Sequence, residues 1–106
     1  TRPATPARTY AYCSDTAYLP EIIPYIRQVD LLYHEATFKD ADAARAHETF
    51  HSTAKEAATI ARDAEVKRLL IGHYSARYED PLPLKQEAVK IFPETTLAKE
   101  GMKINL

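Results

Sequence analysis

The chain has 106 residues, a length that fits one small domain or part of a larger one. Its hydrophobic content of 45% and charged content of 27% are ordinary for a globular domain, and its formal net charge of −1 excludes nucleic-acid binding driven by the field of the whole molecule. The single cysteine, Cys13, excludes an intramolecular disulfide, and no apolar run reaches the roughly 18 residues of a membrane span, so we expect a cytoplasmic protein.

The first residues have the composition of a linker. Residues 1–7 contain two prolines and two threonines and do not begin with methionine. This pattern is typical of a segment inside a longer polypeptide. We therefore expect residues 1–9 to be linker-like and the chain to be a fragment.

Short strands and helices alternate in the first half of the chain. Residues 8–14 are β-prone and predict a strand, and residues 16–27 predict a short helix that Pro24 keeps brief or broken. Residues 30–34 predict a second strand. Residues 39–50 are polar and rich in alanine, which predicts a further helix.

The clearest helix start lies at Thr53. Thr53 and Glu56 have the spacing of a capping box, in which each side chain binds the backbone amide of the other residue. The helix that follows has an apolar face made of Ala54, Ala57, Ala58, Ile60 and Ala61. Residues 66–72 then predict a third strand, whose nearly continuous apolar run favours helices over both faces of the sheet.

Residues 81–92 predict the last helix, and residues 95–99 and 102–106 predict two short strands. The element order is therefore β-α-β-α-β-α-β-β. Such alternation predicts an α/β fold with a largely parallel sheet.

Polar residues follow the predicted strands: Asp15 after the first, His34 and Glu35 at the second, and His73 after the third. The carboxyl ends of parallel strands meet at one edge of a sheet, where ligands bind in open α/β folds. Aspartate and histidine are zinc ligands, and a carboxylate can bridge two ions. Asp15 could instead cap the next helix, and His73 could simply be a hydrogen-bonded residue at a strand end.

His51 lies just before the capped helix. From there a histidine can donate a proton to a leaving oxygen, and a carboxylate such as Glu35 can orient it. The alternative is an exposed histidine in a connection between helices. We assign His47 to the surface and His34 to packing or to support of the site.

Residues 47–51 match the zinc-peptidase pattern H-E-x-x-H. That pattern requires both histidines on one uninterrupted helix, whereas the capping box at Thr53 predicts a new helix after His51. The extended form of the pattern also requires a glycine and a third histidine, which the sequence lacks at positions 54 and 57. We therefore regard a metallopeptidase as the weaker alternative.

Two other classes of function fit the sequence to different extents. A receiver-like signalling domain needs a cluster of acids near its first strand and a lysine where His73 stands, and the sequence has neither. A non-catalytic α/β module that binds phosphate or a partner protein stays open.

Four short motifs in this order resemble the ribonuclease Z family. They are Ser-Asp-Thr at 14–16, His-Glu-Ala-Thr at 34–37, His-Ser-Thr at 51–53 and His-Tyr-Ser-Ala-Arg-Tyr at 73–78. The family consists of metallo-β-lactamase-fold endonucleases that remove the 3′ trailer from precursor tRNA by metal-hydroxide attack. The resemblance implies that residues 10–106 form the C-terminal half of an αββα sandwich.

The resemblance also implies roles for single residues. Asp15 would bridge two zinc ions, and His73 would bind one of them. His51, supported by Glu35, would assist proton transfer to the leaving 3′ oxygen.

Ser75 and Arg77 would lie near the RNA backbone, and Arg77 is the better match because a guanidinium fits phosphate oxygens in a fork. The family usually has phenylalanine at position 74 and proline at position 76, where this chain has Tyr74 and Ala76.

The family's H-x-H-x-D-H motif, which supplies most of its zinc ligands, does not occur in these residues. The resemblance therefore implies an incomplete ligand set. We expect the isolated chain to bind zinc weakly and to be inactive. For the full-length protein the resemblance implies a homodimer that acts on precursor tRNA.

Overall fold

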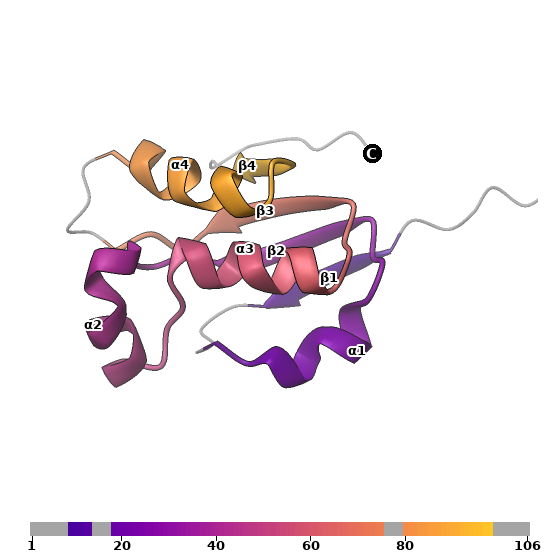
Figure 1. Cartoon of the computed structure of the whole chain (residues 1–106), viewed down its shortest axis with the longest axis horizontal. Helices are drawn as coiled ribbons and strands as arrows, with labels where there is room; N and C mark the ends of the chain where they lie inside the picture. The colour runs from indigo at the N-terminus through magenta and orange to yellow at the C-terminus, as the bar shows by residue number, and fades with distance from the viewer. Residues whose placement is uncertain (1–8, 14–17, 76–79, 99–106) are drawn as a thin grey trace, which may run out of the picture.

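The computed structural model describes residues 9–13, 18–75 and 80–98. They contain a four-stranded sheet in the order β1-β2-β3-β4, and every neighbouring pair of strands is parallel (Figure 1). The strands are β1 (Tyr10–Cys13), β2 (Leu31–Glu35), β3 (Arg68–Gly72) and β4 (Thr95–Leu97). The predicted α/β class and parallel sheet are therefore confirmed for these residues.

The helices alternate with the strands as predicted. They are the 3-10 helices η1 (Pro20–Ile22) and η2 (Asp40–Asp42) and the α-helices α1 (Ile23–Ile26), α2 (Ala43–Glu48), α3 (Ala54–Asp63) and α4 (Leu82–Ile91). The first helix is brief, as expected, with Pro24 in the first turn of α1, where its missing N–H costs no hydrogen bond. The predicted strand at residues 102–106 lies outside the described residues.

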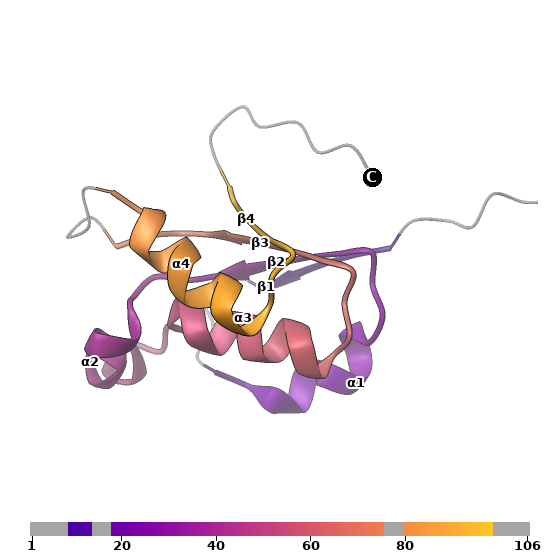
Figure 2. The ribbon, with the colours of Figure 1, turned by 45° about the horizontal axis from the view of Figure 1, so that its top comes forward.

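The described helices all lie on one face of the sheet (Figure 2). The predicted cover of helices on both faces is therefore wrong for this part of the chain. On the other face, Tyr12, Tyr33 and Leu70 form a row across β1, β2 and β3. Tyr12 is 72% exposed and stacks on Tyr33 with 4.5 Å between ring centroids. A strand residue with an apolar side chain can thus be half-buried by the side chains that lie opposite it on neighbouring strands. No helix is needed to cover it.

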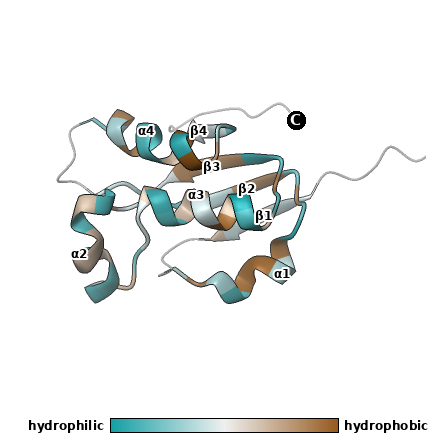
Figure 3. Ribbon diagram, viewed as in Figure 1, coloured by the Kyte–Doolittle hydropathy of each residue, from teal (hydrophilic) through white to brown (hydrophobic). Residues whose placement is uncertain are grey.

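The core lies between the sheet and α3. Its members share near-complete burial, and the largest are Leu32, Leu69 and Ile71 from the strands, Ile60 from α3 and Leu84 from α4. The predicted apolar face of α3 is fully buried, and its small alanines let the helix pack closely on β2 and β3, whose hydrophobic segments lie beneath it in Figure 3.

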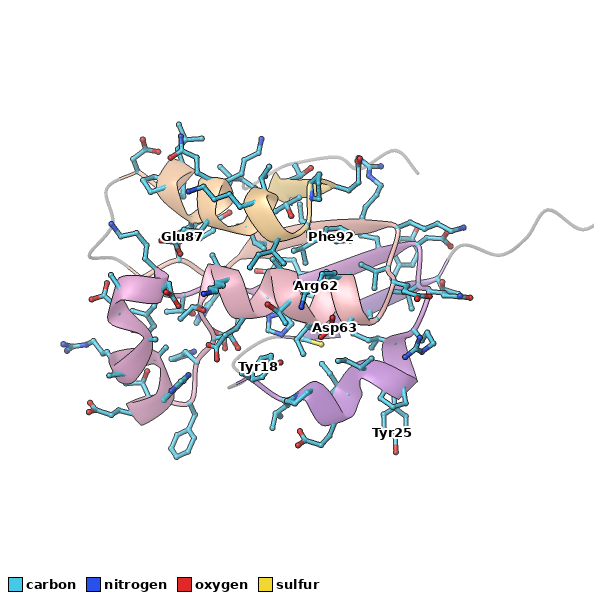
Figure 4. The ribbon with its side chains drawn as sticks, in the orientation of Figure 1. Tyr18, Tyr25, Arg62, Asp63, Glu87 and Phe92 are labelled. Carbon is cyan, nitrogen blue, oxygen red and sulfur yellow. The ribbon has the colours of Figure 1, made fainter. Side chains whose placement is uncertain are left out.

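Outer helix surfaces carry polar or isolated aromatic groups. Arg62 and Asp63 form an exposed ion pair at the end of α3, with 3.1 Å between Nε and Oδ1 (Figure 4). Tyr25 of α1 is almost fully exposed. Among the described residues, no helix combines the length and the apolar character that crossing a bilayer requires.

The predicted capping box is present. The Thr53 hydroxyl accepts a hydrogen bond from Glu56 N–H at 3.1 Å, and the Glu56 carboxylate accepts one from Thr53 N–H at 3.0 Å. Thr53 is fully buried. The start of α3 is therefore fixed directly after the segment that carries His51.

His34 lies in the interior, where we expected it to serve packing or support of the site. It is fully buried, and its Nδ1–H donates to the carbonyl oxygen of Glu35 at 2.8 Å. Its Nε2 atom has no hydrogen-bond partner among the described residues. Burial lowers the pKa of His34 because the charged imidazolium is disfavoured away from water.

Replacing Thr53 with alanine removes the cap of α3. We expect the free energy of unfolding to fall by about 1 to 2 kcal/mol, because Glu56 N–H loses its acceptor at a buried helix end. Thr53→Ser keeps the hydroxyl and should recover most of this loss. Urea denaturation followed by circular dichroism measures both variants, and an alanine variant as stable as the wild type contradicts the prediction.

His34 should make the fold sensitive to mild acid. Its folded pKa lies below the ordinary value of 6.5, so the unfolded chain takes up the proton first as the pH falls. Stability should therefore be unaffected by His34 above pH 6.5 and decline below it, by at most about 1.4 kcal/mol per pH unit.

His34→Asn is the matched control, because it keeps a donor for the Glu35 carbonyl but does not titrate. Urea unfolding across this pH range should give a shallower loss for the variant. Equal slopes for the two proteins would refute the role of His34.

Candidate active site

Three side chains from separate segments meet beyond the carboxyl end of β2. Glu35, His51 and His73 each offer one atom of a metal-ligand type, and these atoms lie within 4.8 Å of one another. Glu35 is paired with Gly72 in the sheet, so His73 follows the residue that lies opposite Glu35. The predicted convergence of strand-end residues is confirmed for Glu35 and His73, and His51 joins them from the turn before α3. Asp15 and Arg77 lie outside the described residues.

The carboxylate of Glu35 is the centre of the cluster. It is fully buried and accepts hydrogen bonds from His51 Nδ1, at 3.0 Å to each oxygen, and from Ser52 N–H at 3.3 Å. The Thr37 hydroxyl also donates to it through a short contact. A buried carboxylate is strongly destabilising unless such donors surround it. Glu35 therefore holds the segments around it in place.

The chain beyond β2 brings His51 to Glu35. After Glu35 the backbone stays extended and runs beside the residues that precede α3. Thr37 N–H donates to Ser52 O at 3.1 Å, and Phe38 and Thr53 form a parallel bridge. This pairing fixes Ser52 and its neighbour His51 next to the end of β2.

His51 is also fixed from the side of α2. Phe50 N–H donates to His47 O at 3.3 Å, and His51 N–H donates to Ala46 O at 2.8 Å. These two bonds make a Schellman motif, which ends the helix with one residue in the left-handed region. That residue is Phe50, with φ of 59°. The chain thus turns sharply between α2 and α3, and His51 sits in the turn.

The same turn contradicts the metallopeptidase alternative. α2 ends at Glu48, so His47 and His51 do not share a helix. The His47 side chain is exposed and lies 3.0 Å from the Glu56 carboxylate, measured from Nε2 to Oε2. The two histidines of the H-E-x-x-H pattern therefore have different partners.

His73 enters the site through a strained turn at the end of β3. Its φ is 61°, a left-handed value that is rare outside glycine. Its Nδ1 lies 3.0 Å from the Thr37 hydroxyl oxygen, and its ring centroid lies 5.4 Å from that of His51. A β-carbon at Gly72 would clash with the end of the Tyr33 side chain, so a larger residue there would require that ring to move.

The donor set fits a divalent metal ion at this edge. Imidazole and carboxylate are zinc ligands, and His73 is the exposed member of the cluster. The Glu35 oxygens are already occupied by three donor groups, which fits an orienting carboxylate better than a metal ligand. A tetrahedral site needs further ligands beyond these residues.

Ser75 and Thr37 connect segments of the site. Ser75, a predicted substrate contact, is half-buried, and its N–H donates to Thr37 O at 2.9 Å. Sequence reasoning missed Thr37, whose side chain and backbone contact all three site segments. Its spacing of two residues from Glu35 in an extended segment was the available signal, because alternate residues face the same side.

The chain is similar to known proteins in sequence and in fold. The family model described as "Beta-lactamase superfamily domain" matches residues 3–74. Proteins named Ribonuclease Z from Parabacteroides distasonis and Porphyromonas gingivalis strain W83 are 68% and 63% identical over all 106 residues. The chain spans 35% of the length of each, about a third of these curated relatives.

Solved structures agree on the fold. The metallo-beta-lactamase fold protein YhfI from Bacillus subtilis is 29% identical with a TM-score of 0.84, and the match covers 91% of this chain and 39% of YhfI. The short form of human tRNase Z is 37% identical with a TM-score of 0.62, over 78% of this chain and 27% of the human protein. The family match includes Glu35, His51 and His73 and covers well over half of the residues, and the chain therefore belongs to the beta-lactamase superfamily.

Proposed function

We propose that this chain is the C-terminal part of a ribonuclease Z, an endoribonuclease that removes the 3′ trailer from precursor tRNA. The observation that carries the proposal is the Glu35, His51 and His73 cluster at one edge of a parallel sheet. High identity to proteins named Ribonuclease Z and similarity to a tRNase Z structure support it.

His73 and Asp15 are the proposed zinc ligands of this chain. Zinc held there would supply Lewis-acid stabilisation of the charge that develops on the phosphodiester. The exposed position of His73 supports a ligand role, because a metal and an RNA strand must both reach it. The remaining zinc ligands of the proposed pair of ions come from the rest of the full-length protein.

His51 is the proposed proton donor to the leaving 3′ oxygen. Its Nδ1–H is held by the Glu35 carboxylate, so the opposite nitrogen, Nε2, is the atom that can exchange a proton with substrate. The His51 side chain is 23% exposed, whereas Glu35 is buried. Glu35 would orient the ring and stabilise its protonated form, as a carboxylate does in hydrolase triads.

Two substrate contacts and the place of this chain in the full-length protein also belong to the proposed function. Ser75 and Arg77 would contact the RNA backbone. Residues 1–9 would be a linker-like segment and residues 10–106 the nuclease part, with the full-length enzyme a cytoplasmic homodimer. The isolated chain would be inactive, because its two proposed zinc ligands cannot complete a tetrahedral site.

His73→Ala in the full-length enzyme should remove metal and activity together, because a proposed ligand is lost. Zinc content by atomic emission and cleavage of precursor tRNA measure the two effects. His47→Ala is the matched control, since His47 is exposed and lies outside the cluster. Wild-type cleavage by the His73 variant would contradict the assignment of His73 as a zinc ligand. An inactive His47 variant would show that the first histidine of the H-E-x-x-H pattern is also needed for activity.

His51→Ala should separate chemistry from metal binding. We expect zinc content to stay at the wild-type level while the single-turnover cleavage rate falls by about 10²- to 10⁴-fold, the usual contribution of a general acid. Glu35→Gln should lower the rate in the same way. Loss of zinc in the His51 variant to the extent seen for His73 would instead make His51 a ligand and contradict its proposed role.

A further inference from the structure

We propose that Thr37 is a positioning residue that fixes the tautomer of His73 and so presents Nε2 of that ring to the metal. The proposal rests on the proposed function, because it concerns how this chain prepares a zinc ligand. It follows from the hydrogen bonds around one buried hydroxyl group.

The Thr37 hydroxyl has a single proton to donate. Oγ1 lies in short contact with Oε2 of Glu35, and a carboxylate only accepts, so the proton points to Glu35. The same oxygen lies 3.0 Å from Nδ1 of His73. With its proton used, Oγ1 can only accept there, and Nδ1 of His73 must carry a hydrogen. The lone pair of the neutral ring is then on Nε2.

The backbone holds this hydroxyl in place. Thr37 is 6% exposed, and its N–H donates to Ser52 O at 3.1 Å while its carbonyl accepts from Ser75 N–H at 2.9 Å. These bonds tie Thr37 to the segment that carries His51 and to the one that carries His73. A β-branched side chain on a fixed backbone has few rotamers, so the hydroxyl cannot easily turn away.

The arrangement connects the proposed metal ligand to the proposed acid–base pair. Glu35 accepts from His51 and from Thr37, and Thr37 accepts from His73. Histidine ligands of metals usually donate their second N–H to such an acceptor, which sets the ring orientation, and its loss typically weakens metal binding or activity by about 10- to 100-fold. One hydroxyl group is therefore hydrogen-bonded both to the proposed metal ligand and to the carboxylate of the proposed acid–base pair.

The test compares Thr37→Val, which keeps the shape and removes the hydroxyl, with Thr37→Ser, which keeps the hydroxyl. Zinc affinity of the metal-free full-length enzyme is measured by chelator competition. We expect the valine variant to bind zinc about 10- to 100-fold more weakly and the serine variant to bind nearly as the wild type does. Equal zinc affinity of the valine variant and the wild type would overturn the proposal.

A second readout does not depend on the variants folding. Long-range ¹H–¹⁵N correlation spectra of the metal-free wild-type enzyme distinguish the two neutral tautomers of an imidazole. We expect His73 to be protonated at Nδ1. A His73 ring protonated at Nε2 would overturn the proposal even if the valine variant cannot be prepared.

The outcomes separate this inference from the function on which it rests. A wild-type enzyme that binds no zinc and leaves precursor tRNA intact would overturn the proposed function, and the role of Thr37 with it. A wild-type enzyme that does both, beside a valine variant of unchanged zinc affinity, would overturn only the role of Thr37.

Discussion

A buried carboxylate at the end of β2 is the constraint on which the site depends. Glu35 is fully buried, and its two oxygens accept from His51, Ser52 and Thr37. Leaving such a group without donors would cost several kcal/mol, so the fold must bring donors to it. Those donors come from the strand's own continuation and from the turn before α3. The hydrogen bonds that this one buried carboxylate requires thus fix two segments that are far apart in sequence.

Parallel strand order brings the third segment to the same place. β2 and β3 end at the same edge, with Glu35 opposite Gly72, and His73 follows directly. Both histidines of the cluster are delivered by left-handed residues that are not glycine: Phe50 before His51, and His73 itself. Such residues are strained by on the order of 1 to 3 kcal/mol and persist where the surroundings over-determine them. The hydrogen bonds to Glu35 and Thr37 stabilise the two strained turns in this way.

Much of this was predictable because it depends on local chemistry. The capping box needs only the spacing of Thr53 and Glu56, and the parallel sheet follows from strands that alternate with helices. The pairing of Glu35 with His51 was also expected. The uncovered face of the sheet was not, because the apolar run of β3 shows that its residues avoid water but not what covers them.

Other features lie beyond sequence reasoning for physical reasons. The turn after α2 has the geometry that glycine usually supplies, but Phe50 occupies it, so no composition signal marks the motif. The role of Thr37 needs the distances from its hydroxyl to Glu35 and His73, which no spacing rule provides. The position of Asp15 lies outside the described residues.

We propose that this sheet edge holds part of a zinc site around His73, with Glu35 and His51 beside it as an acid–base pair. Anomalous diffraction at the zinc edge from crystals of the full-length enzyme would locate the metal. We expect a peak about 2.0 to 2.1 Å from Nε2 of His73 and in contact with Asp15, with His51 Nδ1 still hydrogen-bonded to the Glu35 carboxylate. A zinc peak remote from His73, or Asp15 on the opposite rim of the sheet, would contradict it.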